Sequence, residues 1–228
     1  MLLIINLLFN ALCLQVMPQY RIFICNVYYL IANRKSHLLY DQQPIRFHLQ
    51  GPIWRDFHTR FGSALPTANR EWLLDSGSLT QRLIKSSHHQ FSVQILSQQW
   101  GSAQLSEYNL LGIAPRHCCL IREVLLLCHQ QPWVYARSVL PASSLTGELR
   151  HLRHFDNRPL GQLLFNTPGM HRSPFQIAQL SMSDLPLQAK PLLDNNNKAA
   201  NLWGRRSRFV IYNKPLLVSE IFLPDFQP

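Results

Sequence analysis

The sequence lacks the short motifs that mark nucleotide sites and serine nucleophiles. It has no glycine-rich phosphate-binding loop, no dinucleotide-binding fingerprint and no GxSxG turn, which excludes the usual nucleotide-dependent and serine-hydrolase sites. The pairs His88–His89 and His151–His154 have no cysteine or carboxylate at metal-ligand spacing. We interpret them as solvated histidines, and we expect neither a metal ion nor a cofactor.

Cysteine is scarce, and its positions do not suggest pairing. The chain has 5 cysteines, an odd number, and none belongs to a CxxC pair. Cys118 and Cys119 are adjacent on an expected strand, so their side chains point to opposite faces. A disulfide framework is therefore not expected. This favours a reducing cytoplasm, with the thiols serving as small core hydrophobes.

No apolar run is long enough for a membrane-spanning helix. Residues 2–17 and 20–32 are apolar, but Asn6, Asn10 and Gln15 interrupt the first run and Pro18 ends it. Neither run reaches the about 20 residues that a spanning helix needs. The first basic residue, Arg21, follows the first run, whereas a secretory signal begins with positive charge. We interpret residues 1–65 as a poorly specified N-terminal extension without stable membrane insertion.

Acidic residues are few, and the chain is strongly basic. Lys and Arg total 22 against 12 Asp and Glu, which gives a net charge of +10. Such a charge attracts either nucleic acid or a small anionic substrate. The basic residues are scattered and no nucleic-acid-binding motif is present, so we expect no nucleic-acid partner. The one dense run, 205–208, is interpreted as a solvated strand start whose arginines pair with nearby acids, with substrate steering as the alternative.

From residue 66 onward, the pattern predicts short helices and a mainly antiparallel sheet. Length and a hydrophobic content of 46% suit one buried domain, over residues 66–228. Ser78 and Gln81 match a capping box that starts a helix, and Pro159 suits the first position of another. Tight turns join most strands, so we predict an α+β fold with helices on one side of the sheet or across one end. The expected helices are 68–74, 78–85 and 160–165, and the expected strands are 91–97, 118–128, 133–140, 207–212 and 215–223.

Three charged residues lie within apolar strands. Side chains alternate between faces, so Arg122 shares a face with Leu120 and Val124, Arg137 with Tyr135 and Val139, and Glu220 with Val218 and Phe222. A buried charge without a partner costs several kcal/mol. If these faces meet in one interior, they form a pocket for a small anion. The alternative is a structural ion pair, such as one between Arg122 and Glu220.

Six ordered segments resemble the bacterial chorismate pyruvate-lyase family, whose members make 4-hydroxybenzoate for ubiquinone synthesis. They cover roughly residues 66–226. The segments are WLLDSGSLTQRL (72–83), IREVLLLC (121–128), PWVYARSVLP (132–141), RPLGQLLF (158–165), LWGRRSRF (202–209) and KPLLVSEIFLP (214–224). The resemblance implies a chorismate lyase-like fold, with short helices that close over an internal site. It also implies a lyase that converts chorismate to 4-hydroxybenzoate and pyruvate.

The resemblance also implies roles for five residues. Arg122 matches the carboxylate-binding arginine of the family, Arg137 a second active-site arginine, and Glu220 the active-site glutamate. Leu160 matches a substrate-contacting leucine, and Leu79 stands where the family often has methionine. Ala136 replaces a glycine that the family favours. These expectations describe a cytoplasmic monomer whose only partner is its small-molecule substrate, chorismate.

The same fold also suits two other functions. Ligand-binding domains of some transcription regulators resemble it, so the alternative is a non-catalytic sensor of small metabolites. Residues 1–65 show no winged helix-turn-helix pattern, which argues against a regulator. A degenerate lyase that only carries 4-hydroxybenzoate is disfavoured because Arg122, Arg137 and Glu220 are all present.

Overall fold

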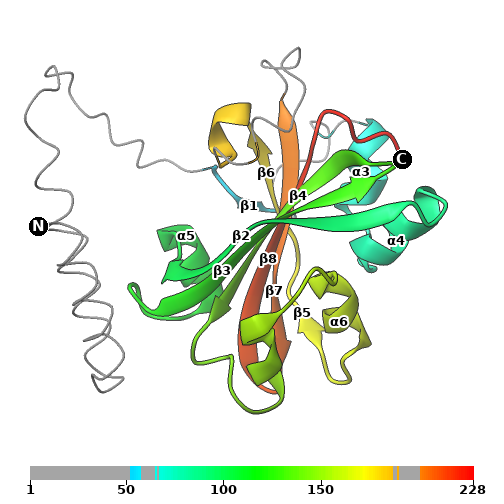
Figure 1. Ribbon diagram of the computed structural model, residues 1–228. Coiled ribbons are helices and arrows are strands. Elements are labelled where there is room, and N and C mark those ends of the chain that lie inside the picture. The colour runs from blue at the N-terminus through cyan, green and yellow to red at the C-terminus, as the bar shows by residue number, and fades with distance from the viewer. Residues whose placement is uncertain (1–51, 58–64, 66, 187–188, 190–200) are drawn as a thin grey trace, which may run out of the picture. The chain divides into compact units, whose positions relative to one another are not determined.

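A computed structural model describes residues 52–57, 65, 67–186, 189 and 201–228, and all structural statements concern these residues (Figure 1). The two apolar N-terminal runs lie outside the described residues, and so does most of the segment 181–198, whose asparagine-rich sequence without a strong period predicts a mobile insertion. Within the described part of the chain, no helix is long and apolar enough to cross a membrane.

The fold is α+β and is built on one antiparallel sheet of eight described strands (Figure 1). The main order is β1-β6-β7-β8-β4-β3-β2, and β5 pairs with β7 beside this path. The strands are β1 (Arg55–Asp56), β2 (Phe91–Ser102), β3 (Cys118–Cys128), β4 (Gln131–Pro141), β5 (His171–Arg172), β6 (Gln176–Leu180), β7 (Leu202–Ile211) and β8 (Lys214–Phe222). β1 pairs with β6, so part of the segment predicted as an extension belongs to the sheet.

Two-residue turns close both predicted hairpins. His129 and Gln130 join β3 to β4 with φ values of 51° and 64°, and Tyr212 and Asn213 join β7 to β8 with φ values of 52° and 60°. Two successive positive φ values match the twist of the flanking strands. The turn predicted at 129–132 is shorter in the structure because β4 begins at Gln131, and the turn predicted at 213–214 lies one residue earlier because β7 ends at Ile211 and β8 begins at Lys214.

Short helices cover both faces of the sheet, whereas the sequence predicted one side or one end. The helices are α3 (Thr67–Leu73), α4 (Leu79–Ser86), α5 (Leu105–Leu111) and α6 (Leu160–Asn166), with 3-10 turns η2 (Gly147–His154) and η3 (Met182–Asp184). The Ser78 hydroxyl accepts a bond from the Gln81 backbone amide at 3.4 Å, which is one of the two bonds of the predicted capping box. Pro159 precedes α6 as its N-cap and is not its first residue.

Strand register decides which side chains share a face. Residues paired directly across antiparallel strands point to the same side. Arg122 pairs with Ser138, and Glu220 pairs with both Ala136 and Arg205. We call this side the first face. The second face holds Glu123, Arg137, Ser219 and Arg206, which are likewise paired in register.

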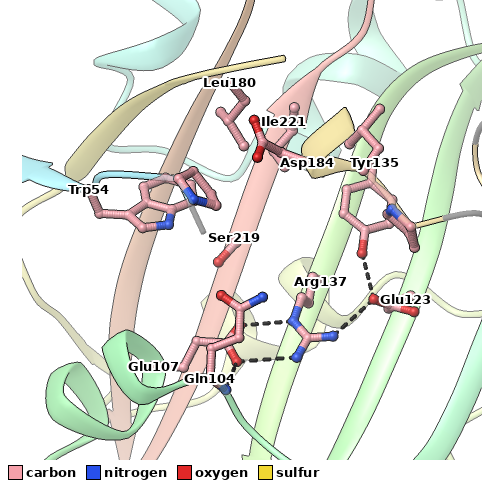
Figure 2. A pocket seen from close by; sticks show the side chains of 13 residues that line it. Trp54, Gln104, Glu107, Glu123, Tyr135, Arg137, Leu180, Asp184, Ser219 and Ile221 are labelled. Carbon is pink, nitrogen blue, oxygen red and sulfur yellow. Dashed lines mark hydrogen bonds and ion pairs between the residues drawn. The ribbon is translucent and has the colours of Figure 1, made fainter. Parts of the chain in front are cut away.

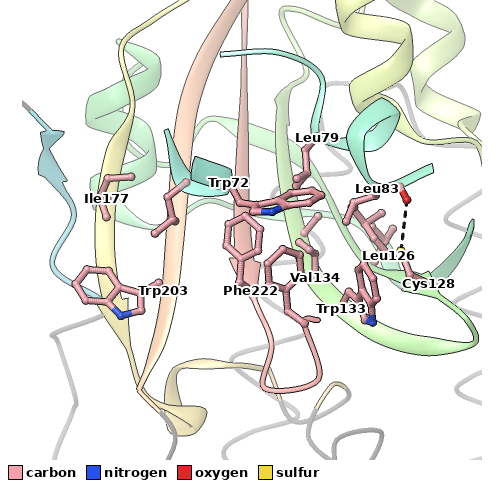
Figure 3. Close-up of a cluster of buried hydrophobic side chains, with 14 of the residues drawn as sticks. Trp72, Leu79, Leu83, Leu126, Cys128, Trp133, Val134, Ile177, Trp203 and Phe222 are labelled. Atoms are coloured by element: carbon pink, nitrogen blue, oxygen red, sulfur yellow. Dashed lines mark hydrogen bonds between the residues drawn. The ribbon is translucent and has the colours of Figure 1, made fainter. Parts of the chain in front are cut away.

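The hydrophobic core is divided between the two faces. On the first face, α3 and α4 pack over one end of the sheet, and η2 and α6 pack over the other. Figure 3 shows the first of these clusters, in which Leu79 and Leu83 of α4 lie against Leu126 and Val134. On the second face, α5 packs against β3, β4 and β8. The sheet is therefore buried on both sides, which allows charged side chains in its middle strands to be enclosed.

Candidate active site

Arg122 is a buried cation on the first face. It lies in the middle of β3, and its residue is 2% exposed. Its Nε donates to Gln98 Oε1 at 3.1 Å, and its Nη2 donates to the carbonyls of Asp156 at 2.8 Å and Arg158 at 3.3 Å. Burial lowers the pKa of Arg122 to about 10, so the side chain stays charged at neutral pH.

No described carboxylate lies within ion-pair distance of Arg122. Its Nη1 also makes no hydrogen bond within the described residues. A guanidinium enclosed without a counter-ion gains free energy when an anion reaches it. The predicted alternative, a structural ion pair between Arg122 and Glu220, is absent from the described residues.

Glu220 is held by a different arginine. Its Oε2 accepts a bond from Arg205 Nε at 2.7 Å, and the Arg205 side chain is fully buried while that of Glu220 is 15% exposed. Arg205 Nη1 also donates to the carbonyls of Trp72 and Asp75, at 2.7 and 2.8 Å. These carbonyls lie at and just beyond the C-terminus of α3, where a cation is favoured. The carboxylate is thereby fixed from β7.

Arg122 and Glu220 line one internal cavity of about 30 Å³. Its wall consists of Thr80, Arg122, Val124, Leu126, Ala136, Ser138, Pro159, Leu160, Gly161, Val218 and Glu220. Leu160 therefore lies at the predicted site. Leu79 lies beside it, in the core cluster that includes Val124, Leu126 and Ala136. The cavity has room for about two water molecules, so a ring-sized ligand requires its walls to separate.

Arg137 does not join this cavity. The strand register places it on the second face, where Figure 2 shows it between two carboxylates. Its Nε and Nη2 donate to Glu107 at 2.8 and 3.2 Å, and its Nη1 donates to Glu123 at 2.9 Å. The expectation that Arg137, Arg122 and Glu220 share one interior is therefore wrong for Arg137. Alternation along one strand shows which of its own residues share a face, but it does not show which residues of the neighbouring strand share that face.

The Arg137 cluster is a closed network of fixed charges. Burial by itself would lower the pKa of Arg137, but the bond and charge of Glu107, with the charge of Glu123, raise it above its usual value. Burial and the neighbouring Glu123 likewise raise the pKa of Tyr135, whose hydroxyl donates to that carboxylate at 2.7 Å. These groups border a second pocket of about 190 Å³. Sequence analysis did not single out Glu107, because nothing local marks α5 as packing on the sheet.

Arg205 and Arg206 of the basic run 205–208 are buried, while Arg208 is partly exposed, so the interpretation of the run as a solvated strand start is wrong although Arg205 does pair with an acid. Arg205 is 0% exposed and Arg206 is 4% exposed. Arg206 lies on the second face, where it donates to Gln176 and Ser106 at 2.9 and 3.1 Å and stacks on Trp54. The run crosses a sheet that is covered on both sides, so alternate arginines are enclosed by opposite layers.

No three His, Cys, Asp or Glu side chains converge as metal ligands within the described ranges.

Among known proteins, the profile of the chorismate lyase family matches residues 53–227. The chain belongs to the chorismate lyase family. The matched region includes Trp54 and β1, which lie before the predicted boundary at residue 66.

Bacterial relatives span most of this chorismate lyase-family chain. A probable chorismate pyruvate-lyase of Pseudomonas fluorescens Pf-5 is 39% identical over 174 residues, which is 76% of this chain and 88% of the relative. That of Pseudomonas putida is 41% identical over 154 residues, covering 68% and 79%. That of Nitrosomonas europaea is 35% identical over 153 residues, covering 67% and 85%.

Two of the solved structures that match this chain are bacterial transcription regulators. PhnF from Mycobacterium smegmatis has a TM-score of 0.49 at 14% identity, covering 68% of this chain and 67% of its own. The ligand-binding domain of a putative GntR-family regulator from Bordetella bronchiseptica has a TM-score of 0.46 at 16% identity, covering 59% and 85%.

Proposed function

We propose that this protein cleaves chorismate to 4-hydroxybenzoate and pyruvate. The observation that supports this most directly is the cavity in which Arg122, a cation without a carboxylate partner, faces the same space as Glu220. Chorismate has a ring carboxylate and a ring hydroxyl at opposite ends of its ring. A cation at one end of an apolar cavity and a carboxylate at the other complement this arrangement.

Arg122 binds the ring carboxylate in this proposal. Its Nη1 makes no bond within the described residues, while Gln98 and two carbonyls fix the rest of the guanidinium. A pre-oriented guanidinium gives a carboxylate a planar, directional partner at little entropic cost. Leu160 and Leu79, on α6 and α4, supply the apolar contact to the ring.

Glu220 acts at the hydroxyl-bearing carbon. There a C–H bond breaks as the ring becomes aromatic, and the neighbouring C–O bond breaks with its electron pair passing to the enolpyruvyl oxygen. The ring proton leaves, and the enolpyruvate takes up a proton to become pyruvate. Glu220 orients the ring hydroxyl first and assists the departing proton second. The bond from Arg205 holds the carboxylate in place for both roles.

The physiological role is also a proposal. The family resemblance supports the use of 4-hydroxybenzoate for ubiquinone synthesis in the cytoplasm. Arg137, predicted as a third active-site residue, is left out of this proposal because it lies on the second face. If this protein restores ubiquinone synthesis in a bacterium that lacks its own chorismate lyase, the result would support the pathway assignment.

The monomeric state stays a prediction, which sedimentation of the purified protein tests.

A turnover assay tests the activity. Purified protein is incubated with chorismate while pyruvate and 4-hydroxybenzoate are followed separately, and equal amounts of both are expected. Arg122→Ala should remove about 3–5 kcal/mol of binding or transition-state energy, which lowers kcat/KM at least about a hundredfold. Arg122→Lys should recover only part, because an ammonium cannot make the bidentate contact.

Arg150→Gln is the control, since Arg150 is exposed on η2 and the change also removes one positive charge. Wild-type kcat/KM in Arg122→Ala would contradict the assignment. Binding of 4-hydroxybenzoate without any turnover of chorismate would instead favour the sensor.

A further inference from the structure

Chorismate has two carboxylates, and Arg122 accounts for one. The arginine predicted for the other, Arg137, lies on the second face. A different arginine approaches Glu220 on the first face. Arg172 of β5 pairs in register with Phe209 of β7, and Phe209 lies two and four residues beyond Ser207 and Arg205 on the same strand face.

The Arg172 guanidinium is enclosed by aromatic rings and weakly bonded. Its centre lies 4.1 Å from the ring centroid of Phe175, 5.1 Å from that of Phe209 and 5.5 Å from that of Phe165. Its Nη1 reaches the carbonyls of Ser76 and Gly77 at 3.4 Å each, which is long for a hydrogen bond. Burial lowers the pKa of Arg172 to about 10, and the charge of Glu220 opposes this change.

Three buried polar atoms on the first face have no hydrogen-bond partner among the described residues. They are Arg172 Nε, Arg205 Nη2 and Ser207 Oγ. Arg205 also lies over the Phe175 ring, at 4.9 Å, so the two guanidiniums share one aromatic neighbour. Buried polar groups are paired in the great majority of cases. Two unpaired N–H donors beside one carboxylate therefore indicate a place for an anionic ligand group.

The charges on the first face support the same conclusion. The described residues place three guanidiniums there, those of Arg122, Arg172 and Arg205, against the single carboxylate of Glu220. Nearby Asp75 is already paired with Arg82 at 3.1 Å, and exposed Asp156 is paired with Arg158 at 2.8 Å. The site has an excess of two positive charges, which matches a ligand with two carboxylates.

We infer that Arg172, together with the free Nη2 of Arg205, binds the enolpyruvyl carboxylate of chorismate. The inference rests on the proposed function. The enolpyruvyl ether is attached to the ring carbon beside the hydroxyl-bearing carbon. With the ring carboxylate at Arg122 and the hydroxyl at Glu220, the side chain of the substrate extends toward Arg172. Bound there, its carboxylate also brings a cation near the ether oxygen that receives the electron pair of the breaking C–O bond.

The product provides a sharp test, because 4-hydroxybenzoate has the ring carboxylate but not the enolpyruvyl carboxylate. Arg172→Gln should lower kcat/KM for chorismate about thirtyfold or more and change the inhibition constant of 4-hydroxybenzoate less than about threefold. Arg122→Gln should weaken both ligands. Arg172→Lys should recover part of the chorismate activity, since it keeps the charge without the planar fork.

Arg150→Gln serves as the matched control for the loss of one exposed positive charge. Circular dichroism and thermal unfolding check that each variant is folded. If Arg172→Gln does not fold, the effects on chorismate and 4-hydroxybenzoate are compared in Arg172→Lys instead. The inference would be overturned if Arg172→Gln weakened the binding of chorismate and 4-hydroxybenzoate equally, or if it left kcat/KM for chorismate unchanged. The proposed function would still stand in either case, provided that activity depends on Arg122. Failure of the wild-type protein to cleave chorismate would instead refute the proposed function.

Discussion

Arg137 illustrates how a buried charge can be structural. The side chains of Glu107 and Glu123 are 3% and 13% exposed, and both form an ion pair with the Arg137 guanidinium. Arg137→Gln leaves two enclosed carboxylates without their cation, so the free energy of unfolding should fall by about 3 kcal/mol. Urea unfolding measures this loss. An unchanged unfolding midpoint would show that the network adds little.

The activity of the same variant separates the two faces of the sheet. Because Arg137 does not line the cavity, the KM for chorismate should change less in Arg137→Gln than in Arg122→Gln, measured where both proteins are folded. Arg150→Gln again controls for net charge. A larger effect on KM from Arg137 than from Arg122 would mean that the predicted role of Arg137 in substrate binding is right.

Arg122 and Glu220 could be recognised from the sequence because charge within an apolar strand is costly. Their partners could not. Glu220 pairs with Arg205 across the β7–β8 hairpin, and Arg205 was assigned to a solvated run. That pairing depends on the register of the β7–β8 hairpin, which is set by a turn at Tyr212 and Asn213, one residue before the predicted turn.

At the level of elements, the cavity is closed by the first turns of α4 and α6. Thr80 and Gly161 face each other there, and a Cβ atom built on Gly161 would lie 3.1 Å from Thr80 Oγ1. This is tighter than an ordinary contact. The glycine therefore lets the two helices approach closely enough to cover the site.

Gly161→Ala should hold these helices apart and raise the inhibition constant of 4-hydroxybenzoate about three- to tenfold, through roughly 1 kcal/mol of lost packing. Adding Thr80→Ala removes the crowded oxygen and should restore part of the affinity. The matched control is Gly101→Ala, because a Cβ atom on Gly101 meets nothing within 4 Å. Equal affinity in all three proteins would contradict the role assigned to this contact.

The helix α5 and the strand β6 are among the elements that the sequence did not predict. The helix α5 begins after Gln104, which is an uncommon N-cap, although Glu107 accepts a bond from the Gln104 amide at 2.8 Å. β6 is short and was not distinguished from its surroundings. By contrast, α4 was predicted because Ser78 is a strong N-cap, and the two long hairpins were predicted from their apolar runs.

At the level of the whole molecule, the sheet extends beyond the predicted domain start. The Phe57 amide donates to the Phe175 carbonyl at 3.2 Å, and Trp54 lies under Arg206 with 4.7 Å between guanidinium and ring centroid. A chain that begins at residue 50 should be more stable than one that begins at Ser63. The expected difference is about 2 kcal/mol, from the lost burial of Trp54 and the exposed edge of β6.

Urea unfolding of the two shortened chains measures this difference, and Trp54→Ala in the longer chain separates the side chain from the strand. Equal unfolding midpoints would support the boundary at residue 66. That boundary stays a prediction until the comparison is made.

The sequence by itself determined the α+β class, both long hairpins and the membership in a family of lyases, because strand alternation, helix caps and ordered motifs are local properties. It also identified Arg122, Leu160 and Glu220 as residues that meet around one cavity. Only the tertiary structure decided which charges face each other. A register shift in the β3–β4 hairpin, at Leu126 and Leu127, accompanies the placement of Arg137 on the side of the sheet opposite Arg122, and pairing with β7 puts Arg172 and Glu220 on the face of Arg205, because side-chain direction depends on pairing between strands.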